Sequence, residues 1–189
     1  MPEPSFDELI AAMKKAAGVL QNAEIPFILG GGLACWARGG PKTEHDVDFM
    51  VKEDDVERAV QAFDDAGYET EKPPEGWLWK AWIDGCLVDL IFHPSGGPIT
   101  QETIDRAEVI EVVALRIPVA TLEDVMSQKL LALTEQEPDY SSVLEIARAL
   151  REQIDWPNVR RRTEDSPFAK GFFTIVEELG VVDRADVGV

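Results

Sequence analysis

The sequence predicts an α+β protein in which helices flank a mixed β-sheet and a helical part follows at the C-terminal end. Three observations lead to this fold class. Residues 24–40 are typical of a strand, a glycine turn and a helix, residues 77–92 are typical of a β-hairpin, and beyond residue 120 the pattern is helical. We therefore expect a catalytic domain over residues 1–120, with a helical subdomain over residues 121–189 packed on it.

The N-terminal segment predicts a helix over about residues 6–22. Ser5 and Glu8 form a capping-box pair at its start, and apolar residues then recur with a period of 3.6. A short buried strand is expected next, from Pro26 to Leu29. It leads directly into a run of three glycines.

These glycines, Gly30, Gly31 and Gly32, connect the strand to a short helix expected over residues 33–37. Backbone N–H groups at a helix start can approach a phosphate closely only where no Cβ intervenes, which gives glycine a physical role there. A plain strand-to-helix turn explains the same three residues. The next segment, residues 46–51, alternates acidic and apolar side chains as a half-buried strand does, and a third helix is expected around residues 56–63.

The hairpin is the most informative turn in the sequence. Residues 77–83 and 86–92 are rich in β-forming side chains and are joined by Asp84-Gly85, a strong signal for a two-residue loop. Counting from this loop puts Lys80 opposite Asp89 on one face. The other face is almost wholly apolar and carries Trp77, Trp79, Ala81, Ile83, Cys86, Val88, Leu90 and Phe92.

The remainder of the chain is expected to be mainly helical. One or two further strands are expected over residues 109–120. Helix starts are then expected at Thr121, at about residue 140 and at Ser166-Pro167. The run Arg160-Arg161-Arg162 has two interpretations, a solvated helix face or a docking patch for a polyanion.

The composition restricts the classes of partner. The chain has 18 lysines and arginines against 36 aspartates and glutamates, a net charge of −18, which disfavours passive binding of nucleic acid by a broad basic surface. Cys35 and Cys86 provide no disulfide framework. The first ten residues lack a signal-peptide pattern, and no segment reaches the roughly 18 to 20 apolar residues of a membrane span. We expect a cytoplasmic protein that does not contact membranes.

Three aspartates are candidate metal ligands. Asp46 and Asp48 lie two apart in one strand, so their side chains share a face, and the hairpin register turns Asp89 away from the apolar face. A solvated strand end is the alternative interpretation of the first two. Asp89 would be costly to bury alone, so either Lys80 or a divalent cation such as Mg²⁺ or Mn²⁺ is expected to compensate it.

The glycine turn, the segment Thr43 to Phe49 and the segment Val88 to Leu90 together resemble the nucleotidyltransferase fold of the polymerase-β-like superfamily. The resemblance covers about residues 24–93 and, more loosely, residues 118–129. The family commonly has Gly-Ser at the turn, where this chain has Gly31-Gly32 and therefore lacks the serine hydroxyl.

The resemblance implies a role for each candidate residue. It implies that Asp46 and Asp48 are metal ligands. Asp89 is implied to be a third ligand or the general base, and Gly30 and Gly31 are implied to form the phosphate-side turn. The co-substrate that such a site implies is an NTP.

Two lysines are candidates for contact with the NTP. Lys42 precedes the acidic strand and would meet phosphate charge there, although loop lysines are usually solvated. Lys129 falls within the apolar stripe of the helix that starts at Thr121, so it reaches solvent along its stem, pairs with a carboxylate or touches the triphosphate. In similar nucleotidyltransferases a lysine at the start of the helical part often has one of the last two roles.

The three-acid site and the resemblance predict a metal-dependent nucleotidyltransferase that moves an NMP from an NTP to an acceptor hydroxyl and releases pyrophosphate. The net charge favours a cationic small molecule, such as an aminoglycoside, as the acceptor. Two alternatives stay open: a toxin-type enzyme that modifies tRNA through the basic cluster near Arg160, and a catalytically silent nucleotide- or partner-binding module. The sequence leaves the oligomeric state open.

Overall fold

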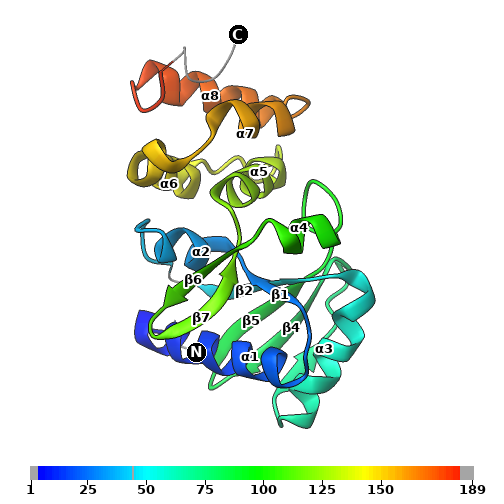
Figure 1. Cartoon of the computed structure of the whole chain (residues 1–189). Coiled ribbons are helices and arrows are strands. Elements are labelled where there is room, and N and C mark those ends of the chain that lie inside the picture. Colours follow the sequence, from blue (N-terminus) through cyan, green and yellow to red (C-terminus); the bar gives the residue numbers. More distant parts are fainter. Residues whose placement is uncertain (1–3, 44, 184–189) are drawn as a thin grey trace.

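A computed structural model describes residues 4–43 and 45–183 of the chain. In these residues one mixed sheet has the strand order β3-β4-β5-β2-β1-β7-β6 (Figure 1). Its strands are β1 (Phe27–Leu29), β2 (Asp46–Val51), β3 (Glu69–Glu71), β4 (Leu78–Ile83), β5 (Cys86–Ile91), β6 (Glu108–Val112) and β7 (Leu115–Val119). The helices are α1 (Phe6–Asn22), α2 (Gly31–Ala37), α3 (Glu53–Asp65), α4 (Gln101–Asp105), α5 (Leu122–Ala132), α6 (Ser141–Leu150), the 3₁₀ turn η1 (Arg151–Gln153), α7 (Trp156–Arg162) and α8 (Pro167–Glu178). The expected α+β class is confirmed.

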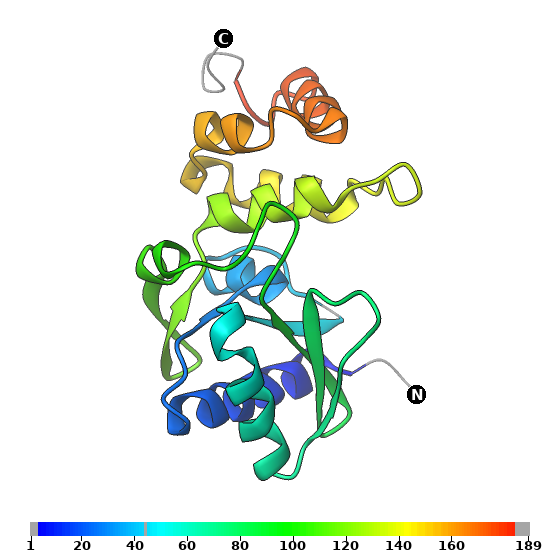
Figure 2. The same cartoon turned by 90° about the vertical axis from the view of Figure 1, so that its right-hand side faces the viewer.

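Helices cover the sheet from more than one side. α1 packs against β2 and β5, α3 packs against β4, and α2 lies between the sheet and α5. Both views show α5 to α8 stacked at one end of the molecule, beyond α2 (Figures 1 and 2). The largest fully buried side chains include Phe49 of β2 and Leu90 of β5. The core therefore packs against the same two strands that carry the acidic residues.

The expected first helix is confirmed with its capping box. Ser5 Oγ accepts a hydrogen bond from the Glu8 backbone N–H, and the Glu8 carboxylate accepts one from the Ser5 N–H at 2.7 Å. This exchange satisfies two backbone donors that a helix start would otherwise leave unpaired. The apolar stripe of α1 can then cover the sheet.

The expected hairpin register is also confirmed. Lys80 pairs with Asp89 and Ile83 pairs with Cys86 across β4 and β5. Asp84 and Gly85 both have left-handed backbone conformations, with φ of 52° and 84°, as the tight two-residue turn requires. Since β5 also runs parallel to β2, with Asp48 opposite Asp89, the hairpin carries Asp89 to the acidic strand.

Neither a start nor an end was predicted for three short elements, β3, α4 and α7. β3 and α4 span only 3 and 5 residues, which is too short for a periodic pattern to show. The start of α7 is marked by Asp155, whose side chain accepts a hydrogen bond from the Asn158 N–H, and by a proline in the first turn. The helix expected from about residue 140 ends at Leu150 and continues only as a 3₁₀ turn.

The three arginines on α7 differ in exposure: Arg161 and Arg162 are exposed, as a solvated helix face requires, whereas Arg160 is half-buried. The docking patch for a polyanion stays a prediction. Arg160 forms an ion pair with Glu177 and lies 4.4 Å from the centroid of the Phe173 ring. Arg162 forms an ion pair with Asp124. Arg160 and Arg162 therefore have acidic partners within the helical part, which offset part of the positive charge that the tRNA-modifying alternative would use.

Asp124 joins the helical part to the sheet side of the molecule. Its carboxylate, 1% exposed as a residue, accepts two hydrogen bonds of 2.8 Å from Arg106, at the end of α4, and one of 2.6 Å from Arg162. Burial by itself would raise the pKa of Asp124, but the hydrogen bonds from the two guanidinium groups outweigh it and lower the pKa. This carboxylate is thus ionised and connects α4, α5 and α7.

The change from sheet to helices falls where the sequence predicts it. β7 ends at Val119 and α5 begins at Leu122, on either side of residue 120. The division into domains over residues 1–120 and 121–189 stays a prediction, and residues 1–3, 44 and 184–189 lie outside the described ranges. None of the helices that the structure describes is both long and apolar enough to span a membrane.

Candidate active site

Three aspartates converge on one face of the central strands. One oxygen from each of Asp46, Asp48 and Asp89 lies within 4.8 Å of the others. Val47, between Asp46 and Asp48, and Val88, directly before Asp89, are fully buried. Strand alternation therefore turns the three carboxylates to the opposite face of the sheet. Asp46 and Asp48 remain partly exposed, whereas Asp89 is only 8% exposed.

The proximity of the three carboxylates changes their protonation. Burial, followed by the negative charge of Asp46, raises the pKa of Asp48 to about 7, and Lys129 opposes this rise. Burial and Asp46 also raise the pKa of Asp89 to about 6, with Lys80 opposing. The ionised forms of Asp48 and Asp89 are therefore disfavoured in the folded protein, because the two lysines offset only part of the effect of burial and of the Asp46 charge.

The donor set fits a hard divalent cation. Carboxylate oxygens are the ligands that Mg²⁺ and Mn²⁺ prefer. Asp89 Oδ1 is buried and has no hydrogen-bond partner among the described residues, which is costly for a carboxylate oxygen. A cation held by the three aspartates would satisfy this oxygen and would offset the burial and the repulsion that raise the two pKa values.

Gly31 lies in direct contact with the acidic cluster. Its φ is +52°, and an ideal Cβ at this position would lie 1.6 Å from Asp48 Oδ2. The preceding Gly30 donates a 2.8 Å backbone hydrogen bond to the Asp48 carbonyl, and a Cβ there would lie 2.6 Å from Met50 Cε. The glycine turn is therefore held against β2, and a side chain at residue 31 would displace the Asp48 carboxylate.

The third glycine shows a residue that sequence reasoning missed. An ideal Cβ at Gly32 would lie 2.6 Å from Thr43 Cβ and 2.7 Å from Thr43 Oγ1. The space into which a serine at this turn would extend is thus taken by the Thr43 side chain, which brings a hydroxyl to the same place. The only sequence signal for this was a hydroxyl residue shortly before the acidic strand.

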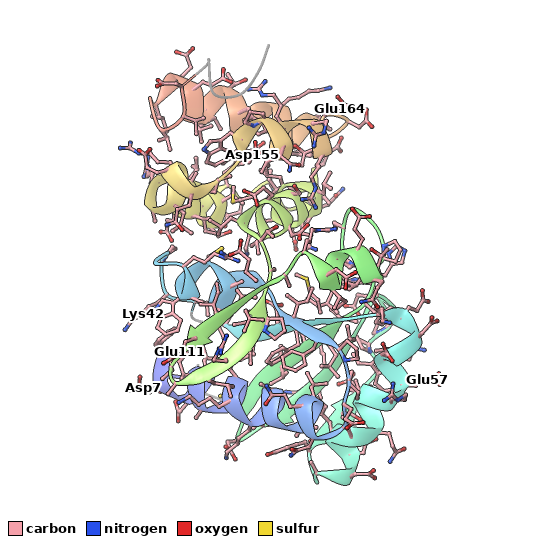
Figure 3. All side chains as sticks on the ribbon, in the orientation of Figure 1. Asp7, Lys42, Glu57, Glu111, Asp155 and Glu164 are labelled. Atoms are coloured by element: carbon pink, nitrogen blue, oxygen red, sulfur yellow. The ribbon has the colours of Figure 1, made fainter. Side chains whose placement is uncertain are left out.

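The three lysines singled out from the sequence differ in their surroundings. Lys129 is half-buried on α5, close enough to Asp48 for its charge to act on that carboxylate. Lys80 is half-buried opposite Asp89, but no ion pair joins them within the part of the chain that the structure describes. Lys42 is exposed at the outer edge of the molecule, near the start of α1, with Nζ 4.8 Å from the centroid of the Phe6 ring (Figure 3).

Two cavities meet at Asp48 and Lys129, which line both of them. The first, here the Trp77 cavity, has a volume of about 630 Å³ and mostly apolar walls that include Met50, Trp77, Ile91, Pro94 and Val125. The second, here the Lys42 cavity, has a volume of about 570 Å³ and polar walls that include Gly32, Lys42, Thr43, Asp46, Asp139, Ser142 and Glu145. An acidic centre between an apolar and a polar cavity can serve two different ligands.

Comparison with a family model gives a partial match. The model of the aminoglycoside-2''-adenylyltransferase family matches residues 12–77, which contain the glycine turn, Asp46 and Asp48. Asp89 lies outside the matched segment. No curated protein matches the chain.

Solved structures match over most of the chain. A crystal structure of ANT(2'')-Ia in complex with adenylyl-2''-tobramycin has a TM-score of 0.64 and 13% identity, over 86% of this chain and 98% of that one. An antigenic nucleotidyltransferase-like protein from Paracoccidioides brasiliensis has a TM-score of 0.55 and 14% identity, over 96% of this chain and 90% of that one. The lincosamide antibiotic adenylyltransferase LnuA, with lincomycin bound, has a TM-score of 0.50 and 16% identity, over 76% of this chain and 97% of that one. The chain thus has the nucleotidyltransferase fold, and the resemblance to that family of folds is confirmed.

Proposed function

We propose that this protein is a metal-dependent enzyme that transfers an NMP from an NTP to a hydroxyl group of a small molecule and releases pyrophosphate. The observation that carries the proposal is the convergence of three carboxylates, one with an unpartnered oxygen, where two cavities meet. The matched family model is that of an adenylyltransferase. Of the structures with the same fold, ANT(2'')-Ia was crystallised with adenylyl-2''-tobramycin, and the lincosamide antibiotic adenylyltransferase LnuA was crystallised with lincomycin. These comparisons support a small-molecule acceptor and a transferred NMP.

Asp46, Asp48 and Asp89 would hold Mg²⁺ or Mn²⁺. When bound, the metal supplies charge stabilisation at the phosphoryl group that is transferred. As the alternative to its role as third ligand, Asp89 would be the base that accepts the proton of the attacking hydroxyl. The new bond forms between the acceptor oxygen and the α-phosphorus, and the bond from that phosphorus to the pyrophosphate oxygen breaks.

We assign the nucleotide to the Lys42 cavity. Its walls combine two cations, Lys42 and Lys129, with the Thr43 hydroxyl and the glycine turn, all of which suit phosphate oxygens. Asp139 and Glu145 line the same cavity and would repel a triphosphate. The phosphates are therefore assigned to the two lysines, and the two acids to hydrogen bonds with the hydroxyls of the ribose.

We assign the acceptor to the Trp77 cavity. Trp77 is 39% exposed, which is unusual for so large an apolar side chain, and Met50 and Ile91 extend the apolar wall toward the aspartates. The net charge of −18 attracts a cation toward the protein. The acceptor that fits both features is a small molecule with an apolar part, a positive charge and a free hydroxyl.

The first test is transfer of a labelled nucleotide. We expect an NTP labelled at its α-phosphate to label a small molecule in a panel that contains tobramycin, lincomycin and RNA, with Mg²⁺ or Mn²⁺ present. Transfer and pyrophosphate release should both stop on chelation, because the aspartates need the metal to accommodate the phosphates. Label on RNA would instead support the tRNA-modifying alternative, and NTP binding without transfer to any acceptor would support the silent binding module.

Lys129 and Lys80 are expected to have separable roles. Lys129→Met should weaken NTP binding by about tenfold or more, because it removes a cation from the wall of the cavity assigned to the nucleotide. Lys80→Met should instead lower the free energy of unfolding by about 1 kcal/mol, because Asp89 loses the nearest opposing charge, and added Mg²⁺ should restore part of the loss.

Thermal melts with and without Mg²⁺ and NTP measure both effects. Lys14→Met is the matched control, since Lys14 is exposed on α1 and the change in net charge is the same. If both variants have wild-type melting temperatures and wild-type nucleotide shifts, the two lysines only extend to solvent and have neither role.

A further inference from the structure

A third cavity, of about 200 Å³, lies beside α5 and is named here the Arg106 cavity. Its walls come from three parts of the chain that are distant in sequence: Arg106 after α4, Ser127 and Leu131 on α5, and Arg162 on α7. The segment from Ser95 to Gly97 and Gln128 close it on the side of the Trp77 cavity, because they line both. The Arg106 cavity is thus separate from the acidic centre but shares a wall with the cavity next to it.

The charge of this cavity is opposite to that of the protein as a whole. Two arginines line it, and Asp124 neutralises only one of the two positive charges. Glu102 acts weakly on the charge of Arg106 but does not line the cavity. One positive charge therefore remains at this place in a chain of net charge −18.

The arginines also retain unused hydrogen-bond donors. Arg106 uses Nε and Nη2 toward Asp124, and Nη2 also contacts Thr103 Oγ1. Arg162 uses Nη2 toward Asp124. A guanidinium group has five N–H donors, so within the described residues Arg106 Nη1 and the Nε and Nη1 groups of Arg162 are available to a ligand.

Ser127 provides an independent observation. The residue is 2% exposed, and its Oγ is buried without a hydrogen-bond partner in the described part of the chain. A buried hydroxyl without a partner is costly, and a serine within a helix commonly bonds to a preceding carbonyl instead. Because Ser127 also lines the Arg106 cavity beside two arginines, a ligand there with acceptor oxygens is the partner that we infer for this hydroxyl.

We propose that the Arg106 cavity is a binding site for a small oxyanion of the phosphate type, held by Arg106, Arg162 and the Ser127 hydroxyl. The volume is below the roughly 300 to 1,000 Å³ of pockets for larger organic ligands, so a nucleotide does not fit. Bidentate guanidinium groups match the oxygens of phosphate in geometry as well as charge. The bound anion balances the charge that Asp124 leaves uncompensated.

The shared wall gives the anion a further effect on the Trp77 cavity. Gly96 and Gly97 have φ of +103° and +116°, backbone conformations that residues other than glycine rarely adopt. The shape of this wall therefore depends on its two glycines. An anion in the Arg106 cavity would contact this shared wall, so we expect it to change the affinity for the acceptor. This consequence rests on the proposed function, whereas the anion site itself does not.

Phosphate binding to the full chain, without metal or nucleotide and at constant ionic strength, tests the proposal. We expect inorganic phosphate to raise the melting temperature in a saturable way and to give a binding isotherm in calorimetry. Arg162→Gln should weaken the affinity by tenfold or more, and Ser127→Ala should weaken it by about threefold to tenfold. Because Arg162→Gln also removes a partner of Asp124, Ser127→Ala is the variant that separates ligand binding from folding: without phosphate it should melt no lower than the wild type.

Two controls distinguish this site from the candidate active site. Arg161→Gln changes the neighbouring arginine, which does not line the cavity, and should leave phosphate binding unchanged. Lys129→Met should also leave it unchanged, whatever its effect on NTP. Phosphate binding that is lost in Lys129→Met but kept in Ser127→Ala and Arg162→Gln would overturn the proposal, as would the absence of any saturable effect of phosphate on the wild type.

Discussion

Asp48→Asn is expected to reduce NMP transfer by about 10³-fold or more while leaving the fold intact. The substitution keeps the size of the side chain but removes a negative charge from the three-carboxylate cluster, in which the carboxylate oxygens lie within 4.8 Å of one another. It also leaves the contact with Gly31 occupied by an atom of similar size. Loss of activity would therefore report the charge and not a collapse of the site.

The same substitution is expected to stabilise the metal-free protein at pH 8 by about 2 kcal/mol. The pKa of Asp48 is raised to about 7 in the folded state, mainly by burial and then by the charge of Asp46. A carboxyl group with a raised folded pKa binds its proton more tightly when folded, so stability falls as the pH rises from about 4 to about 7. Asparagine carries no charge, and the advantage of the variant should disappear near pH 4. Water at the partly exposed Asp48 side chain weakens both the cost of burial and the repulsion from Asp46, so the stabilisation is expected to be smaller than the full pKa shift would give.

Urea melts between pH 4 and pH 8, with chelator or with Mg²⁺, measure this effect. Metal should stabilise the wild type and cancel the advantage of Asp48→Asn. Asp54→Asn, at an exposed position in the first turn of α3, is the chemically matched control and should not stabilise the protein at any pH. Equal stability of Asp48→Asn and the wild type at pH 8 would show that solvent already relieves the repulsion, and retained transfer would exclude Asp48 from the reaction.

Gly31→Ala is expected to lower the free energy of unfolding by about 2 to 4 kcal/mol and to abolish transfer. Two physical effects add at this position. The backbone has a φ of +52°, which costs any residue with a Cβ, and the added Cβ would lie 1.6 Å from Asp48 Oδ2. Either the turn or the carboxylate has to move, and both belong to the proposed site.

Gly67→Ala separates the two effects. Gly67 also has a positive φ, of +83°, but an added Cβ would meet nothing within 4 Å, so this variant should lose only about 1 kcal/mol. In the background of Asp48→Ala, Gly31→Ala should cost about 1 kcal/mol less, because the contacting oxygen is gone. Chemical denaturation of the wild type, Gly31→Ala, Asp48→Ala and the double variant gives the coupling energy between residues 31 and 48 directly. If Gly31→Ala is no more harmful than Gly67→Ala, the Asp48 side chain can turn away freely.

Local sequence patterns determined a large part of this fold. The capping box at Ser5 and Glu8 located the start of α1, and Asp84-Gly85 determined the register that brings Lys80 opposite Asp89. Both are short-range features, since a cap or a two-residue turn is decided by residues three or four apart. Strand alternation similarly predicted that Asp46 and Asp48 share a face. Their roles as metal ligands stay predictions, as do those of Asp89, Lys129, Lys42, Gly30 and Gly31.

Only the tertiary structure decided which distant residues meet. No local pattern places Thr43 against Gly32, and none pairs Arg162 with Asp124, which lies 38 residues away. The cavities at Asp48 and beside Arg106 likewise depend on how α5 packs against the sheet and the loop before α4. Periodicity and turn signals describe the direction in which a side chain leaves its own element, whereas its partner is set by the packing of elements far apart in the chain.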